Sequence, residues 1–257
     1  MIITDSHAHL TSTALLPQVD QILEHAKVAS VCRIVNICTD EQTLLDGLTL
    51  AARTNLVFNA AATTPHDVAK EGASFFPFVE KAAKEKKLVA IGETGLDYFY
   101  EHSPREQQQE YLIRYFALAQ DTGLPLIIHC RDAFSDLFRL ADAHYKGPLL
   151  LHCFTGTQEE AKEGIARGWK ISMSGILTYK KSQELRDVAV IIPNENLFIE
   201  TDAPFLAPQS KRGQQNQPAF IVETLQTLAD LKKVSLQEMA TITTENAMQF
   251  FSFPKDI

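Results

Sequence analysis

Short apolar runs alternate with longer amphipathic stretches along the whole chain. Runs such as LVAIG and PLIIH are almost continuously apolar, which is typical of parallel strands buried on both faces. The pattern predicts eight strands, at 2–6, 31–38, 56–61, 88–92, 125–129, 149–152, 170–174 and 197–201. It predicts helices between and after them, at 17–29, 41–53, 74–86, 104–122, 133–144, 158–167, 182–190, 218–232 and 235–251.

Eight strands that are each followed by a helix predict a (β/α)8 TIM barrel, an α/β fold that forms one domain of about 250 residues. The chain has 257 residues and shows no linker, repeat or low-complexity tract, so we expect residues 1–257 to form a single barrel domain. A doubly wound open sheet is the alternative. It usually has fewer units and a glycine-rich first turn, which this sequence lacks.

The composition is that of a globular protein with a substantial core, since 45% of the residues are hydrophobic. No apolar run is long enough to cross a membrane, and no basic segment followed by an apolar run marks a signal peptide. The four cysteines lie in separate apolar segments, and we expect reduced thiols in a cytoplasmic, monomeric protein. Two of them, Cys130 and Cys153, each follow a histidine and are expected to face the core.

The formal net charge is −8 and the isoelectric point is near 5.5. Both values argue against a broad basic surface for nucleic acid. They leave room for a polyanionic substrate, because bound divalent cations add local positive charge that a count of side chains omits.

Ionisable residues gather where the predicted strands end. Barrel enzymes place their active sites on the face where the carboxyl ends of the strands meet, so we expect these side chains to converge. A strand directs residues two apart to the same side, which would turn His7 and His9 into the barrel mouth together. The residues at this rim are His7, His9, Glu93, His129, His152, Glu200 and Asp202.

Each of these residues alone is weak evidence for a site. A single histidine after an apolar run, such as His152, is more often a hydrogen-bonded core residue, and Glu93 before Thr94 and Gly95 is able to cap a turn. Buried polar groups without partners cost about 1–3 kcal/mol each in mutational data. A metal site that binds them all therefore explains the set better.

The same stretches resemble the TatD family of metal-dependent deoxyribonucleases, within the wider group of amidohydrolase-like metal hydrolases. The matching segments run in order over essentially the whole chain: DSHAHL at 5–10, AIGETGLDY at 90–98, PLIIHCRDA at 125–133, LHCFTG at 151–156, IETDAPFLAP at 199–208 and RGQQNQP at 212–218. This resemblance implies a TIM-barrel hydrolase that cleaves DNA with the help of divalent cations.

The resemblance also implies two metal ions that share Glu93. One would be held by His7, His9, Glu93 and Asp202, and the other by Glu93, His129 and His152. A carboxylate has two oxygens and is able to span two cations about 3.5–4 Å apart. Mixed imidazole and carboxylate ligands suit Zn, Mn, Co or Ni better than Mg. We expect Mg or Mn in activity assays, with Zn as an alternative occupant.

Asp202 and Glu93 are the candidate catalytic residues. Two cations lower the pKa of a water between them, and Asp202 is the candidate to take its proton, although metal binding weakens a carboxylate as a base. Glu200 either orients a ligand histidine or pairs with a buried cation.

The candidates for substrate contacts are His66, Arg131, Tyr98, Phe154 and Arg212. Arg131 is suited to a bidentate phosphate contact or to a salt bridge with Asp132 or an acidic residue of a neighbouring loop. Tyr98 is the strongest of the aromatic residues after GLD for stacking a base, and Phe154 is a weaker candidate. Arg212 is a candidate for contact with the nucleic-acid backbone, and the alternative is that it belongs to a solvated loop.

The sequence departs from the family in two places. The family commonly has Gly-x-His-Pro-His after its third strand, whereas this chain has AATTPH, with Thr64 in place of the first histidine and His66 in place of the second. The family's Asn-Glu-Pro in the late loop is Asn216-Gln217-Pro218 here. Both changes bear on substrate choice and rate, and neither removes a metal ligand.

Three interpretations follow. The leading one is a metal-dependent 3′–5′ exonuclease on single-stranded or damaged DNA. The second keeps the metal chemistry but assigns an ester or amide substrate, such as an aminoacyl-tRNA, and predicts cleavage of an acyl ester instead of DNA. The third is a scaffold with structural metals, which predicts closed sites. A shared carboxylate with few ligands per ion disfavours the third interpretation.

Overall fold

A computed structural model describes residues 1–253 of the chain. Eight parallel strands pair in sequence order from β1 to β8. They are β1 (Ile3–Ala8), β2 (Val31–Cys38), β3 (Val57–Ala61), β4 (Ala90–Asp97), β5 (Leu126–Arg131), β6 (Leu149–Leu151), β7 (Lys170–Met173) and β8 (Leu197–Ile199).

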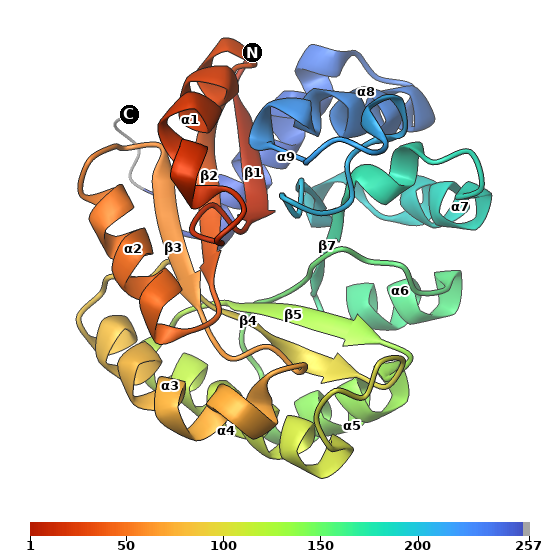
Figure 1. Ribbon diagram of the computed structural model, residues 1–257. Coiled ribbons are helices and arrows are strands. Elements are labelled where there is room, and N and C mark those ends of the chain that lie inside the picture. Colours follow the sequence, from red (N-terminus) through yellow and green to blue (C-terminus); the bar gives the residue numbers. More distant parts are fainter. Residues whose placement is uncertain (254–257) are drawn as a thin grey trace.

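Helices surround the strands on the outside (Figure 1). They are α1 (Val19–Val28), α2 (Glu41–Ala51), α3 (Val68–Lys84), α4 (Arg105–Thr122), α5 (Phe134–His144), α6 (Gln158–Ala166), α7 (Gln183–Ile191), α8 (Ile221–Lys232) and α9 (Leu236–Phe250). Short 3₁₀ turns lie at η1 (Leu16–Gln18), η2 (Gly175–Thr178), η3 (Asn194–Asn196), η4 (Gln209–Lys211) and η5 (Pro218–Phe220). This alternation confirms the predicted (β/α)8 barrel. Residues 1–253 contain no helix with the length and hydropathy needed to cross a membrane.

The first and last strands meet at the carboxyl end of the barrel. The Asp202 N–H donates to the His7 carbonyl at 2.9 Å, and the His9 N–H donates to the Ala203 carbonyl at 2.7 Å. The Ser6 hydroxyl donates to the Ile199 carbonyl at 2.9 Å. These contacts bring residues from the two ends of the chain to the same part of the rim.

The core has two layers. The larger layer lies between strands and helices, where apolar residues of both kinds of element pack together. A smaller cluster combines single buried residues from the strands, such as Val35 and Ile127, with aromatic residues at the end of α9 and beyond it, including Phe250 and Phe253. The carboxyl ends of the strands are the part left for polar side chains.

Two predicted boundaries differ from the structure by five residues or more. β4 extends to Asp97 instead of ending at residue 92, so Glu93 lies inside the strand. α3 begins at Val68, six residues before its predicted start, and contains Gly72 and Pro77. Glycine and proline usually weaken a helix, but at Gly72 α3 contacts the Tyr111 ring so closely that a Cβ would lie 2.6 Å from it.

Candidate metal centre

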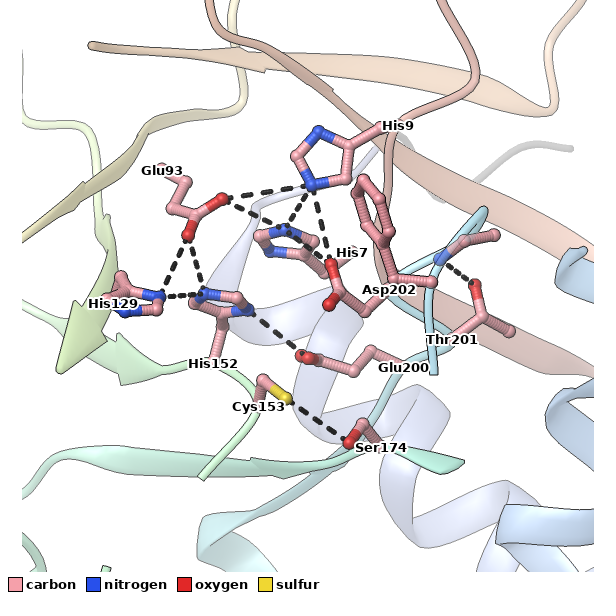
Figure 2. Close-up of polar contacts among 12 residues, drawn as sticks. His7, His9, Glu93, His129, His152, Cys153, Ser174, Glu200, Thr201 and Asp202 are labelled. Carbon is pink, nitrogen blue, oxygen red and sulfur yellow. Dashed lines mark hydrogen bonds and ion pairs between the residues drawn. The ribbon is translucent and has the colours of Figure 1, made fainter. Parts of the chain in front are cut away.

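The six residues proposed as metal ligands come together at the barrel mouth (Figure 2). They come from five different strands or the residues just beyond them. His7 is in β1, His9 just beyond it, Glu93 in β4, His129 in β5, His152 directly after β6, and Asp202 in the segment after β8.

The first group of ligand atoms faces one oxygen of Glu93. The His7 Nε2 atom lies 3.3 Å from His9 Nε2, 3.5 Å from Glu93 Oε2 and 3.5 Å from Asp202 Oδ1. The His9 Nε2 atom lies 3.4 Å from Asp202 Oδ1 and 3.8 Å from Glu93 Oε2. Atoms bound at 2.0–2.2 Å to one tetrahedral ion lie about 3.3–3.6 Å apart, so this spacing fits a divalent cation.

The second group faces the other oxygen of the same carboxylate. Glu93 Oε1 lies 2.9 Å from His152 Nε2 and 3.1 Å from His129 Nδ1, and these two nitrogens are 3.4 Å apart. Three protein atoms leave a tetrahedral cation with an open position, which is the arrangement of catalytic rather than closed structural sites. Glu93 thus presents one oxygen to each group, which fits the shared role that the resemblance implies.

Each histidine of the second group has a carboxylate behind it. His152 Nδ1 lies 3.3 Å from Glu200 Oε1, and the Glu200 side chain is completely buried. Within residues 1–253 no lysine or arginine pairs with Glu200, which favours the role of orienting His152 over the alternative of a buried ion pair. His129 Nε2 lies 2.9 Å from Asp97 Oδ2. Such carboxylate partners fix the tautomer and orientation of a ligand imidazole.

Asp97 is a residue that the sequence analysis missed. Its other oxygen, Oδ1, accepts hydrogen bonds from the backbone N–H groups of Phe99 and Tyr100 at 3.0 and 2.7 Å. The signal was present in the sequence, because Asp97 lies four residues after Glu93 and an even spacing places both on the same side of a strand. It was overlooked because the predicted strand ended too early.

The electrostatics of the cluster favour an ionised Glu93. Burial alone would raise the pKa of this carboxyl, but the charge of His152 and hydrogen bonds from His129, His152 and His7 hold it well below its usual range. Burial lowers the pKa of His7, so its imidazole stays neutral and keeps a lone pair for a cation. The His7 and His152 rings stack with centroids 3.9 Å apart, a contact that two imidazolium ions would disfavour.

Close backbone packing makes the position of Glu93 possible. A Cβ on Gly95, whose φ is +148°, would lie 1.9 Å from the His129 carbonyl oxygen. A Cβ on Gly92, whose φ is +154°, would lie 2.6 Å from the Ile127 side chain. Glycine is required at both positions, because it alone combines this backbone conformation with the close approach of β4 to β5.

Two of the proposed substrate residues lie beside the second group. Arg131 lies over the rings of Phe99 and Tyr100, at 3.7 and 4.9 Å from their centroids, and forms no ion pair within residues 1–253. The salt bridge to Asp132 considered for Arg131 is therefore absent. His66 Nε2 lies 3.7 Å from the Asp97 carboxylate, and the side chain is 28% exposed.

Phe154 is a correction to the proposed set of substrate contacts, and the hydroxyl of Tyr98 already has partners in the protein. The Tyr98 hydroxyl is 2.9 Å from an Asp136 oxygen and 2.7 Å from Gln109 Nε2, so it is bound between α4 and α5. Phe154 is only 3% exposed and packs against Phe134. Phe154 is therefore not free to stack a base, whereas Tyr98 is half-buried with the Arg105 guanidinium 4.2 Å from its ring centroid.

The remaining residues singled out in the sequence lie as follows. Arg212 lies over the Tyr179 ring, 4.5 Å from its centroid. The Thr64 hydroxyl donates to Asp67 at 3.1 Å, so it is engaged within its own loop. Cys153 lies beyond the end of β6 and not within a strand; it is half-buried, its φ is +44°, and its Sγ lies 3.3 Å from Ser174 Oγ.

Comparisons with known proteins agree with this geometry. The family described as TatD related DNase matches residues 4–252 of the chain. The uncharacterized metal-dependent hydrolase YabD of Bacillus subtilis is 34% identical over 249 residues, which cover 96% of this chain and 98% of YabD. The 3′–5′ ssDNA/RNA exonuclease TatD of Erwinia amylovora is 31% identical over 255 residues, covering 96% of this chain and 98% of that protein.

A solved structure gives the same result. The crystal structure of YjjV, a TatD homologue from Escherichia coli, superposes on this chain with a TM-score of 0.92 at 27% sequence identity and covers 98% of both chains. The similarity therefore extends over the whole barrel and includes every segment that contributes to the cluster of histidines and carboxylates.

Proposed function

We propose that this chain, which belongs to the family of TatD-related DNases, hydrolyses phosphodiester bonds of DNA as a 3′–5′ exonuclease on single strands. Membership of a family of metal-dependent hydrolases gives the reaction class. The observation that carries the proposal is the placement of Glu93, which directs one oxygen to each of two groups of ligand atoms. The name of the Erwinia relative supports the polarity and the strandedness.

The proposed cations are two divalent ions, Mg or Mn, with Zn as an alternative. His7, His9, Asp202 and one oxygen of Glu93 would hold the first ion, and His129, His152 and the other oxygen of Glu93 would hold the second. When bound, such a pair lowers the pKa of a water between the ions and polarises phosphoryl oxygens.

The remaining tasks fall to side chains of this chain. Asp202 is the proposed proton acceptor, because its Oδ1 lies in the first group while its carboxyl is held in the anionic form. Burial would raise the pKa of Asp202, but the hydrogen bond from His9 and the charges of His7, His9 and His152 lower it. Arg131 is the proposed phosphate contact, because stacking on two rings restrains its guanidinium and no carboxylate among residues 1–253 pairs with it.

The test uses metal-stripped protein and end-labelled oligonucleotides, in single-stranded and double-stranded form. Mg, Mn, Zn or no metal is added back, and the metal content of each sample is measured. An Asp202→Ala protein is the matched control. We expect metal-dependent shortening of the single strand from its 3′ end, and loss of that activity in the variant.

The opposite result is equally definite. A protein that binds two cations but cleaves no DNA with any metal would contradict the nuclease proposal. Acyl esters such as aminoacyl-tRNA would then become the substrates to examine, because the same cluster is able to polarise a carbonyl oxygen.

A further inference from the structure

Exposed aromatic side chains are concentrated at the barrel mouth. Within residues 1–253 four phenylalanine or tyrosine side chains are exposed, namely Phe78, Phe99, Tyr100 and Phe205. Phe78 lies on α3, whereas the other three lie in the segments that follow β4 and β8. Phe205 is the most exposed of the four, at 58%, and its ring makes a T-shaped contact with the His9 ring at a centroid distance of 5.9 Å.

Phe205 differs from the other two rings at the mouth because no stacked ring or guanidinium covers it within residues 1–253. The Arg131 guanidinium covers one face of Phe99, and the His102 ring stacks on Tyr100 at 5.4 Å with an interplanar angle of 9°. The only aromatic contact of Phe205 within residues 1–253 is the T-shaped one with His9, at an interplanar angle of 73°. A flat group of a ligand is therefore able to lie on it.

The backbone around Phe205 is held firmly by buried groups. The Asn216 side chain, 1% exposed, donates to the carbonyls of Thr201 and Phe205 at 2.8 and 2.6 Å. Asp202 and Leu206 adopt φ of +55° and +54°, a region that is costly for residues with a Cβ. Non-glycine residues keep such conformations where the surrounding structure imposes them, and these are concentrated at functional sites.

Tight packing from a neighbouring segment fixes the same loop from behind. Gly175 in η2 approaches the Leu206 carbonyl so closely that a Cβ would lie 2.2 Å from its oxygen. The Phe205 N–H donates to the Asp202 carbonyl at 2.9 Å, which links the ring to the segment of a proposed metal ligand. An exposed phenyl ring on a rigid backbone loses little conformational entropy when it binds a ligand.

We propose that Phe205 is the platform on which an unpaired nucleobase stacks beside the scissile phosphate. This inference rests on the proposed function and adds the reason for its strand preference. Aromatic platforms bind bases of any sequence, because every base has a π-face. A base that lies on Phe205 has left its partner, so the site takes a single strand. Arg131, next to the His129 end of the cluster, would receive a neighbouring phosphate on the other side.

The experiment measures binding and cleavage separately. Fluorescein-labelled dT6 with hydrolysis-resistant phosphorothioate linkages is titrated with Mn-loaded protein, and fluorescence anisotropy gives the dissociation constant. Further oligonucleotides lack one base at the first, second or third position from the 3′ end, and a last one lacks all six. The proteins are wild type, Phe205→Ala, Phe205→Leu, Phe205→Trp and, as a matched exposed control, Phe78→Ala. The metal content of every protein is determined in parallel.

Stacking on an aromatic side chain predicts a dissociation constant roughly 5–150-fold higher for Phe205→Ala with intact dT6. Phe205→Leu keeps apolar bulk without a π-face and should also bind weakly, whereas Phe205→Trp and Phe78→Ala should bind like wild type. Removal of one particular base should abolish the difference between wild type and Phe205→Ala. This non-additivity identifies the base that lies on the ring.

Two results would overturn the inference. If the wild type cleaves ordinary single-stranded DNA and Phe205→Ala binds every oligonucleotide as tightly as the wild type does, the nuclease proposal stands and Phe205 is not a platform for a base. If Phe205→Ala loses the same factor on all oligonucleotides, including the one without bases, the ring acts on the loop or the backbone and not on a base. A wild-type protein that neither binds nor cleaves DNA would contradict both proposals together.

Discussion

Replacing Asp97 by asparagine should weaken the binding of one of the two proposed cations and leave the binding of the other unchanged. Asp97 Oδ2 accepts from His129 Nε2 at 2.9 Å, while Oδ1 accepts from two backbone N–H groups. An asparagine has one acceptor oxygen, so its amide N–H₂ must face either the backbone N–H groups or the His129 ring. With the amide oxygen kept on the backbone, His129 gives up its Nε2 proton and carries it on Nδ1 instead. That tautomer blocks the nitrogen that faces Glu93.

The size of the effect follows from the role of this contact. Loss of a carboxylate behind a ligand histidine typically reduces metal affinity 10–100-fold, which corresponds to about 1.4–2.7 kcal/mol. The first group of ligand atoms contains neither His129 nor Asp97, and its distances do not depend on this hydrogen bond. We therefore expect one affinity to fall within that range and the other to change by less than about threefold.

The assay is calorimetric titration of metal-free protein with Mn²⁺ or Zn²⁺, which gives two binding constants for wild type and Asp97→Asn. Asp142→Asn is the matched control, because that exposed carboxylate pairs only with Arg167 in the described structure. If both constants fall by the same factor, or if neither falls, the assignment of Asp97 to a single metal site is wrong.

Three further predictions concern packing, charge and substrate. Gly95→Ala should destabilise the protein by roughly 2–4 kcal/mol in chemical denaturation. Gly168 also has a positive φ, but a Cβ there would have no atom within 4 Å, so Gly168→Ala should cost only about 1 kcal/mol. Similar values for the two variants would refute the clash with His129. Arg131→Ala should raise KM for an oligonucleotide roughly 10-fold or more through a lost charged hydrogen bond, and an unchanged KM would remove Arg131 from the site. Burial would raise the pKa of Asp97, but the hydrogen bonds from His129 and the Tyr100 N–H lower it to about 2. Above pH 4 the wild type should thus have a free energy of unfolding about 2 kcal/mol higher than that of Asp97→Asn, and this difference should disappear as the pH falls from about 4 to 2. A difference that is independent of pH in denaturant titrations would contradict the lowered pKa.

The sequence predicted the barrel because its strands are buried on both faces and therefore read as apolar runs. The alternation of these runs with amphipathic stretches gave all eight strands in order, and the start of α6 was clear because Thr157 and Glu160 form a capping box. The predicted end of β4 was too early for a physical reason. Gly92 and Gly95 look like breaks in a strand, but they are the points where β4 approaches β5 too closely for a side chain.

The convergence of the candidate ligands was predictable, because the ends of parallel strands meet on one face of a barrel. The surrounding contacts were not. Tyr98 and Phe154 follow the right motifs, but side-chain packing turns Tyr98 towards Asp136 and buries Phe154. Phe205 went unnoticed because its exposure depends on how Asn216, eleven residues later, holds the loop. Contacts of this kind depend on tertiary structure and leave no periodic signal.

The most direct test of the account is a crystal structure of the Mn-loaded protein with anomalous diffraction data at the manganese edge. We predict two anomalous peaks on opposite sides of the Glu93 carboxylate. One should lie among His7, His9 and Asp202, and the other between His129 and His152. A single peak, or a second peak between His66 and Asp97 instead of beside His152, would contradict the shared role of Glu93 and the two-metal chemistry derived from it.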